Sequence, residues 1–166
     1  MSTFAKVLLA TDLTPQSDNL TECLFSLCPD TETEVVLAHV FDDDDDADPD
    51  GSNYKKVNSR LEGYKNELEQ AGYEDVKLIT PVGDEPFEAI CDAGEEHEAD
   101  LLMVASHGKG FLKSTLMGST TFDLARATTL PLFISKDDGV DESKLLDTIL
   151  IPTDFNTSAL NCIPNL

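Results

Sequence analysis

Five short apolar runs recur along the chain, and the segments between them carry helical periodicity. The runs are Lys6–Thr11, Glu34–Val40, Val76–Thr80, Leu101–Ala105 and Pro131–Ser135. Near-continuous apolar content is typical of strands that are buried on both faces of a parallel sheet. The alternation of these strands with helices therefore predicts an α/β fold, in which a doubly wound parallel sheet of five strands is covered by helices on both faces.

The segments between the runs also carry the start and stop signals of helices. Thr14 followed by Pro15 is typical of an N-cap with proline at the first helical position, and Pro86 starts a later helix. Gly72 ends the long helix before the third run. Apolar residues spaced by three and four predict the buried faces of these helices: Leu20, Cys23, Leu24 and Leu27, then Val57, Leu61, Tyr64, Leu68 and Ala71, then Phe87, Ile90 and Cys91.

Length and charge narrow the class of protein. A chain of 166 residues with 40% hydrophobic content can bury one core, which predicts one domain. The net charge of −22, from 33 acidic and 11 basic residues, argues against a nucleic-acid partner. We interpret it as a solvated acidic surface, such as a salt-rich, halophilic cytoplasm would favour. No apolar run approaches the about 20 residues of a membrane-spanning helix, and no signal peptide is recognisable, so we expect a soluble cytoplasmic protein.

Two features that could bind metals or form disulfides are weak. The four cysteines, Cys23, Cys28, Cys91 and Cys162, form no CxxC pair and have no histidine at zinc spacing, so we interpret them as reduced core thiols. The aspartate run 42–46 lacks the glycine turn and the spaced ligands of an EF-hand. We expect it to be a hydrated loop.

The segment after the fourth run, SHGKGFLKSTLMGST, is rich in glycine and hydroxyl residues. A loop that leaves a parallel strand and enters a helix offers free backbone N–H groups and the positive end of the helix dipole to an anion. Gly108 and Gly118 are separated by nine residues, and Ser119 and Thr120 follow in the expected first helical turn. Glycine allows close approach to a phosphate, and hydroxyls add donors. The alternative is a simple surface turn followed by a serine-capped helix.

Established nucleotide and catalytic motifs are missing. Leu112 and Lys113 stand where the P-loop and the dinucleotide fingerprint, respectively, require glycine. No nucleophile motif places a Ser-His-Asp or Cys-His arrangement, and no carboxylate pair is positioned for acid–base chemistry. We therefore predict a protein that is not an enzyme, or at most a very slow ATPase.

These features together resemble the universal stress protein family, whose signature is G-x2-G-x9-G-[ST] after strand four. The resemblance covers about residues 4–136. It implies strand order 3-2-1-4-5 in a Rossmann-like three-layer sandwich of the nucleotide-binding alpha hydrolase type. The signature stands here as Ala105-Ser106-His107-Gly108, nine residues and Gly118-Ser119, with Ala105 in place of the first glycine.

The resemblance implies a binding site for ATP, with or without magnesium. It assigns Asp12 and Val40 to the nucleoside, and Gly108, Gly118, Ser119 and Thr120 to the phosphates; Thr11, Ala105, Ser106 and His107 complete the predicted site. It also implies a homodimer that forms by pairing of strand five. Two functions follow: a stress-response regulatory module that binds an adenine nucleotide, or a nucleotide-free dimeric scaffold that acts through protein contacts.

The end of the chain repeats its beginning. Residues 148–156, TILIPTDFN, match the opening KVLLATDLT, with Leu150, Thr153 and Asp154 in the places of Leu8, Thr11 and Asp12. We therefore predict a universal stress protein domain over residues 1–136, a linker over 137–147, and over 148–166 a stub that resembles the first strand of a second copy. In a longer tandem chain, the two copies could pair through strand five.

Overall fold

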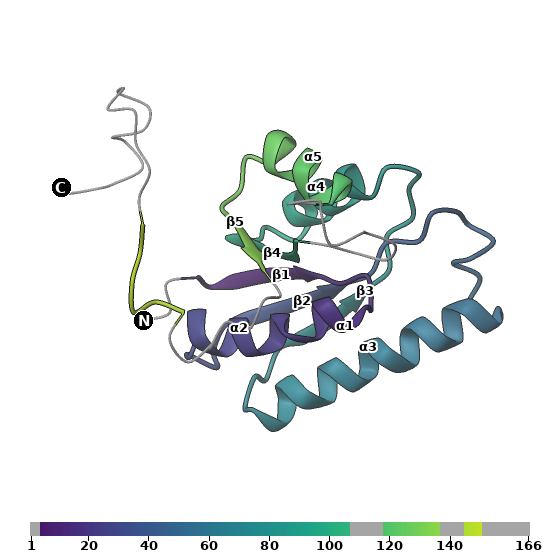
Figure 1. The fold of residues 1–166 in the computed structure, drawn as a ribbon. Coiled ribbons are helices and arrows are strands. Elements are labelled where there is room, and N and C mark those ends of the chain that lie inside the picture. Colours follow the sequence, from purple (N-terminus) through teal and green to yellow (C-terminus); the bar gives the residue numbers. More distant parts are fainter. Residues whose placement is uncertain (1–3, 107–117, 137–144, 151–166) are drawn as a thin grey trace.

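Parallel strands form a single sheet in the order β3-β2-β1-β4-β5 (Figure 1). The computed structural model describes residues 4–106, 118–136 and 145–150. The strands are β1 Lys6–Ala10, β2 Glu34–Ala38, β3 Val76–Ile79, β4 Leu101–Ala105 and β5 Leu132–Ser135. The helices are α1 Pro15–Asp18, α2 Leu20–Leu27, α3 Ser52–Gln70, α4 Pro86–Glu96 and α5 Ser119–Ala127. The predicted fold class and strand order are confirmed.

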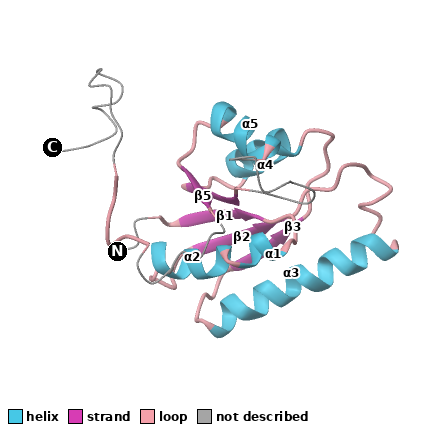
Figure 2. Ribbon diagram, in the orientation of Figure 1, coloured by secondary structure: helices cyan, strands magenta, loops and turns pink. Residues whose placement is uncertain are grey.

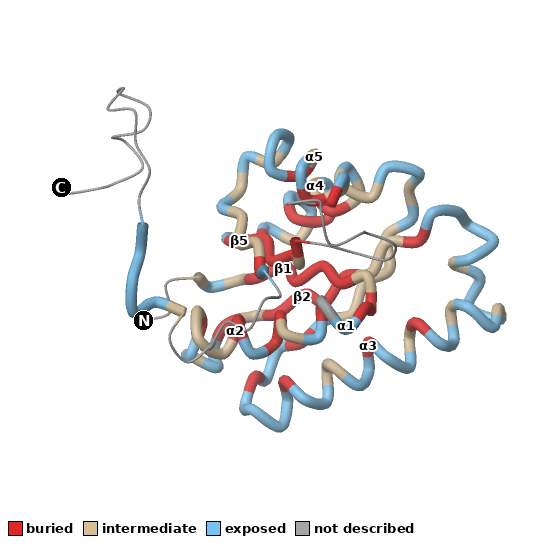
Figure 3. The backbone as a smooth tube through the Cα atoms, in the orientation of Figure 1, coloured by how far each residue is buried: buried red, intermediate tan, exposed pale blue. Residues whose placement is uncertain are grey.

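The sheet is covered on both faces, which explains the near-continuous apolar runs. Val7 and Leu9 of β1 lie in one core cluster with Leu24 of α2 and Leu68 of α3. The alternate residues of β1 belong to a second cluster, together with residues of α4 and α5. Figure 2 shows the resulting layers, with α1, α2 and α3 on one side of the sheet and α4 and α5 on the other. In Figure 3 the strands form the buried centre between them.

Two glycines are required by the local geometry. Gly72 follows α3 with a φ of 104°, the left-handed conformation that ends many helices. At Gly94 of α4, an added Cβ would lie 2.9 Å from Leu102 Cδ2 and 3.0 Å from Leu130 Cδ1, so this glycine allows α4 to approach the sheet closely. The helix predicted after Thr14 differs from expectation, because it is divided at Asn19 into α1 and α2.

The strand register determines which residues meet at the carboxyl end of the sheet. Ala10 lies opposite Ala38 of β2 on one side and opposite Val104 of β4 on the other. The next residue along each strand path, Thr11, His39 and Ala105, therefore reaches the same edge. A third cluster of Leu13, Phe41, Val57 and Leu61 packs the loops after β1 and β2 against α3.

Only a short part of the predicted linker and stub is described. Leu145 packs against the first core cluster, whereas Leu146, Ile149 and Leu150 are exposed. Residues 148–150 form no strand, and residues 151–166 lie outside the described parts of the chain, so the second-copy interpretation stays a prediction. Within the described residues, no helix combines the length and the apolar character needed to cross a membrane.

Candidate functional site

A hollow of about 470 Å³ opens at the carboxyl ends of β1, β2 and β4. It lies where the strand order reverses between β1 and β4, which is where open α/β sheets leave a crevice for ligands. Its walls come from the loops after these strands and from the first turns of α3, α4 and α5. The lining residues are Ala10, Thr11, Asp12, Ser17, Ala38, His39, Val40, Phe41, Asp42, Asp46, Asn53, Val57, Pro86, Ile90, Val104, Ala105, Gly118, Ser119, Thr120, Thr121 and Leu124.

Most of the predicted site residues meet in this hollow. They come from four separate stretches of sequence: Thr11, Asp12, Val40, Ala105, Gly118, Ser119 and Thr120. Ser106 is buried and does not line the hollow. His107 and Gly108 lie outside the described residues.

The loop after β1 is held by its own side chains. The Thr11 hydroxyl accepts a hydrogen bond from the Leu13 amide at 3.0 Å and donates to Ser17 Oγ at 2.8 Å. Asp12 Oδ1 accepts from both the amide and the hydroxyl of Thr14, at 3.1 and 2.7 Å. Thr14, which was predicted to cap α1, directs its hydroxyl to Asp12 instead and makes no side-chain cap. These bonds hold the Asp12 carboxylate against the Thr14 end of the loop, where it lines the hollow.

Aromatic side chains that follow β2 form one wall of the hollow. His39 Nδ1 lies 2.8 Å from the Thr11 carbonyl oxygen, which positions the ring beside the loop after β1. The His39 ring meets Phe41 edge to face at 5.2 Å between centroids, and Phe41 stacks on Tyr54 of α3 at 5.9 Å. These aromatic contacts give this side of the hollow an apolar body beside the Asp12 carboxylate.

The opposite side of the hollow is the N-terminus of α5. Gly118 precedes the helix and donates its amide to the Ser106 carbonyl at 2.7 Å, and Thr121 Oγ1 donates to the Ala105 carbonyl at 2.9 Å. Among the described residues, no side chain caps α5. The first amides of a helix have no intrahelical acceptor, so this end of the hollow can bind an anion.

The alanine that replaces the first signature glycine fits its position without strain. Ala105 is the last residue of β4 and is extended; of the described non-glycine residues, only Leu13 and Glu98 have a positive φ. A left-handed conformation is therefore not required at this position. Ala105 lines the hollow, which remains open.

Acidic residues dominate the charge of the hollow. Asp12, Asp42 and Asp46 line it, whereas no lysine or arginine does so among the described residues. The described residues also contain no group of three or more His, Cys, Asp or Glu side chains placed to hold a metal ion. Among the described residues, the groups of the lining that favour a negatively charged ligand are those at the α5 N-terminus, and dissolved cations would screen the carboxylates.

Sequence reasoning missed several lining residues. His39 is not among the predicted site residues, and Asp42 and Asp46 belong to the run that we expected to be a hydrated loop. The predicted strand order already placed the end of strand two beside strand one, which could have revealed residues 39–42. Asp46 and Asn53 reach the hollow through the path of the β2–α3 loop, which no local pattern indicates.

Comparison with known proteins identifies a family that the sequence matches over most of its length. A sequence profile described as the universal stress protein family matches residues 3–136. The universal stress protein MJ0577 of Methanocaldococcus jannaschii is 34% identical over 82 residues, which are 49% of each chain. A universal stress protein of Mycolicibacterium smegmatis is 29% identical over 136 residues, covering 77% of this chain and 44% of that protein. The chain thus spans about half the length of these two relatives.

Solved structures show the same architecture. The structure of MJ0577 superposes with a TM-score of 0.71 at 27% identity, and the match covers 82% of this chain and 98% of that one. A universal stress protein crystallised in complex with cAMP gives a TM-score of 0.60 at 21% identity, covering 79% of this chain and 95% of that one. The second likeness, at lower identity, bears on the fold alone.

Proposed function

Since this chain belongs to the universal stress protein family, we propose that its hollow binds an adenine nucleotide, ATP in particular, and that the protein acts as a regulatory module of the stress response. We propose that the protein acts by binding the nucleotide and not by hydrolysing it. A universal stress protein of the same fold has been crystallised with cAMP, so this fold can hold an adenine nucleotide.

The observation that carries the proposal is the two-sided character of the hollow. Its volume of about 470 Å³ lies within the usual range for small-molecule sites. One side offers the Asp12 carboxylate and an apolar wall, which suits a ribose and a base. The other offers Gly118, Ser119 and Thr120 at a helix N-terminus, which suits phosphates. A nucleotide has the same two-sided chemistry.

A regulatory role requires that the nucleotide favour one state of the protein over another. We propose that the second state differs in self-association through β5, which is an edge strand of the sheet. Such an edge leaves backbone groups available for pairing with a second copy. The acidic composition is consistent with a cytoplasmic, salt-rich setting, which we include in the proposal.

Freshly purified protein provides the direct test. Denaturing it and analysing the released small molecules by mass spectrometry should identify an adenine nucleotide, and calorimetry on the emptied protein should show saturable ATP binding in the presence of magnesium. Light scattering with and without ATP tests the link to self-association. Absence of both released nucleotide and a calorimetric response would refute the nucleotide proposal.

The acidic lining favours one other function. Three carboxylates around the hollow disfavour a polyanion, and this supports a nucleotide-free scaffold that acts through dimerisation and protein contacts. The scaffold predicts a stable dimer whose melting temperature does not respond to magnesium-ATP. A turnover assay at high protein concentration separately tests for slow ATP hydrolysis.

A further inference from the structure

The loop that presents Asp12 contains a strained residue. Leu13 has a φ of 59°, which is costly for a residue with a Cβ. Its side chain is 6% exposed and packs in the cluster with Phe41, Val57 and Leu61. An unfavourable backbone conformation persists only where surrounding contacts hold it, so the contacts of this loop determine where Asp12 lies.

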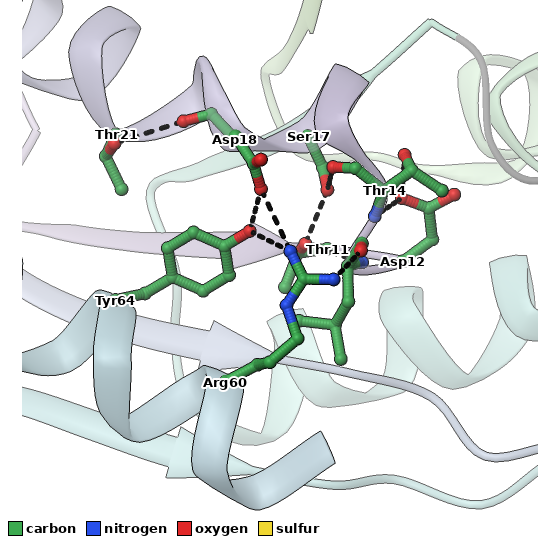
Figure 4. A network of polar contacts seen from close by, with 9 residues as sticks. Thr11, Asp12, Thr14, Ser17, Asp18, Thr21, Arg60 and Tyr64 are labelled. Atoms are coloured by element: carbon green, nitrogen blue, oxygen red, sulfur yellow. Dashed lines mark hydrogen bonds and ion pairs between the residues drawn. The ribbon is translucent and has the colours of Figure 1, made fainter. Parts of the chain in front are cut away.

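One peptide group links these contacts to Asp12. The carbonyl of Leu13 and the amide of Thr14 belong to the same planar unit, so they turn together. The Thr14 amide donates to Asp12 Oδ1 at 3.1 Å. The Leu13 carbonyl accepts a hydrogen bond from Arg60 Nη1 of α3. Arg60 and Asp12 therefore hold opposite ends of a single peptide (Figure 4).

Arg60 is oriented by two further side chains. Its Nη2 lies 3.3 Å from Asp18 Oδ1 and 3.4 Å from the Tyr64 hydroxyl, and that hydroxyl also donates to Asp18 (Figure 4). Burial, and then the hydrogen bond to Asp18, raise the pKa of Tyr64 to about 12. Because the Arg60 and Asp18 side chains are about half exposed, their ion pair alone stabilises the fold little.

We propose that Arg60 is a positioning residue for nucleoside binding: by holding the Leu13–Thr14 peptide in its strained orientation, it fixes the Asp12 carboxylate at the rim of the hollow. Arg60 does not line the hollow itself. A charge-assisted bond to a carbonyl is stronger than a neutral one, which suits a guanidinium to this task. The proposal rests on the proposed function, because it concerns the same site.

The hydrogen bond by which Arg60 holds the Leu13–Thr14 peptide, here called the Arg60 clamp, is tested by a double-mutant cycle with Asp12. Arg60→Met removes the guanidinium but keeps much of the side-chain length, and should weaken ATP binding about fivefold. In an Asp12→Ala background the same change should have almost no effect, since Arg60 acts through that carboxylate. Arg60→Lys retains one donor and should give an intermediate loss. Lys56→Met, an exposed position one turn earlier on α3, is the matched charge control.

Amide hydrogen exchange tests the Arg60 clamp in the absence of any ligand, because it measures how firmly the Thr14 amide is held. Exchange of the Thr14 amide should accelerate in Arg60→Met and not in Lys56→Met, with the core amides of β1 unchanged in both. Unchanged Thr14 exchange, or an equal loss of ATP affinity with and without Asp12, would overturn the clamp. If the wild-type protein binds no ATP, the proposed function fails and the role in binding fails with it, even where Thr14 exchange responds.

Discussion

The two ends of the sheet use their charged residues in opposite ways. At the amino end, Glu34 bonds to Lys77 at 2.6 Å and to Lys6 at 3.1 Å. Asp100 Oδ2 accepts the amides of Ala5 and Lys6, both at 2.9 Å. Each of these carboxylates has cationic or N–H partners supplied by the fold. At the carboxyl end, Asp12 accepts hydrogen bonds from Thr14, but Asp12, Asp42 and Asp46 all line a hollow whose described lining includes no lysine or arginine.

This difference distinguishes carboxylates that stabilise the folded protein from carboxylates that act on a bound ligand. Carboxylates with cationic or N–H partners contribute to the stability of the fold, whereas carboxylates that line a hollow can also act on a ligand through their charge. The comparison therefore predicts that acidic residues at the amino end affect stability, and that those at the carboxyl end affect binding.

The largest expected effect is the loss of ATP affinity in Asp12→Ala. Removing a charged hydrogen-bonding group at a binding site should weaken ATP about thirtyfold, equivalent to about 2 kcal/mol. Calorimetric titration with magnesium-ATP measures the change, and thermal unfolding checks that the variant is folded. Wild-type affinity in this variant would show that the carboxyl end does not serve a ligand through Asp12.

The converse change at the amino end is Asp100→Ala. It leaves the Ala5 and Lys6 amides without their acceptor, and should cost about 1–2 kcal/mol in the free energy of unfolding while ATP affinity stays unchanged. Urea denaturation and calorimetry on the same preparation measure the two quantities. A loss of ATP affinity comparable with that of Asp12→Ala would break the contrast between the two ends.

Much of the fold could be predicted because its signals are local. The five apolar runs coincide with the five strands to within two residues at either end. β5 begins one residue later than its run, at Leu132, and three of the differences lie at the carboxyl ends, where Thr11, Val40 and Thr80 follow the last paired residues of their strands. Their hydrophobicity or β-branching continues the pattern beyond the ladder. The strand order, in contrast, came from the family resemblance and not from periodicity.

The site was less predictable where it depends on contacts distant in sequence. Asp12 and Gly118 stand at strand and helix ends, which the sequence indicates. Arg60 reaches the Leu13 carbonyl across 47 positions, and it does so because the third core cluster packs α3 beneath the β1 loop. Nothing in the spacing around Arg60 distinguishes it from a solvated arginine on a helix surface.

Removing the other carboxylates of the hollow should change ATP affinity less than Asp12→Ala does, and should raise it instead of lowering it. Asp42→Asn and Asp46→Asn each remove a negative charge from the lining of the hollow, and should raise ATP affinity about threefold at low salt. The gain should vanish at about 1 M salt, where the screening length falls to about 3 Å. Glu62→Asn, on exposed α3, is the control for net charge. A gain that persists at high salt would contradict an electrostatic cause.

The smallest expected effect concerns the pH dependence of Glu34. The hydrogen bond from Lys77, assisted by Lys6, lowers the pKa of this carboxyl from its ordinary value of 4.5. A lowered folded-state pKa stabilises the protein above the unfolded-state value, and this contribution is lost as the pH falls through the folded-state value. Glu34→Gln should therefore cost about 0.5 kcal/mol at pH 7, because one partner is half exposed.

The cost of Glu34→Gln should shrink as the pH falls below the ordinary pKa of 4.5, since the unfolded chain is protonated first and the folded carboxyl, whose pKa is lower, is protonated last and then resembles the amide. Urea midpoints across this range measure it, with Glu62→Gln as a control for general charge effects. The same variant should leave ATP affinity unchanged at pH 7. A stability difference that stays constant down to pH 3 would mean that Glu34 acts through packing, and the contrast between the two ends would then rest on Asp100 alone.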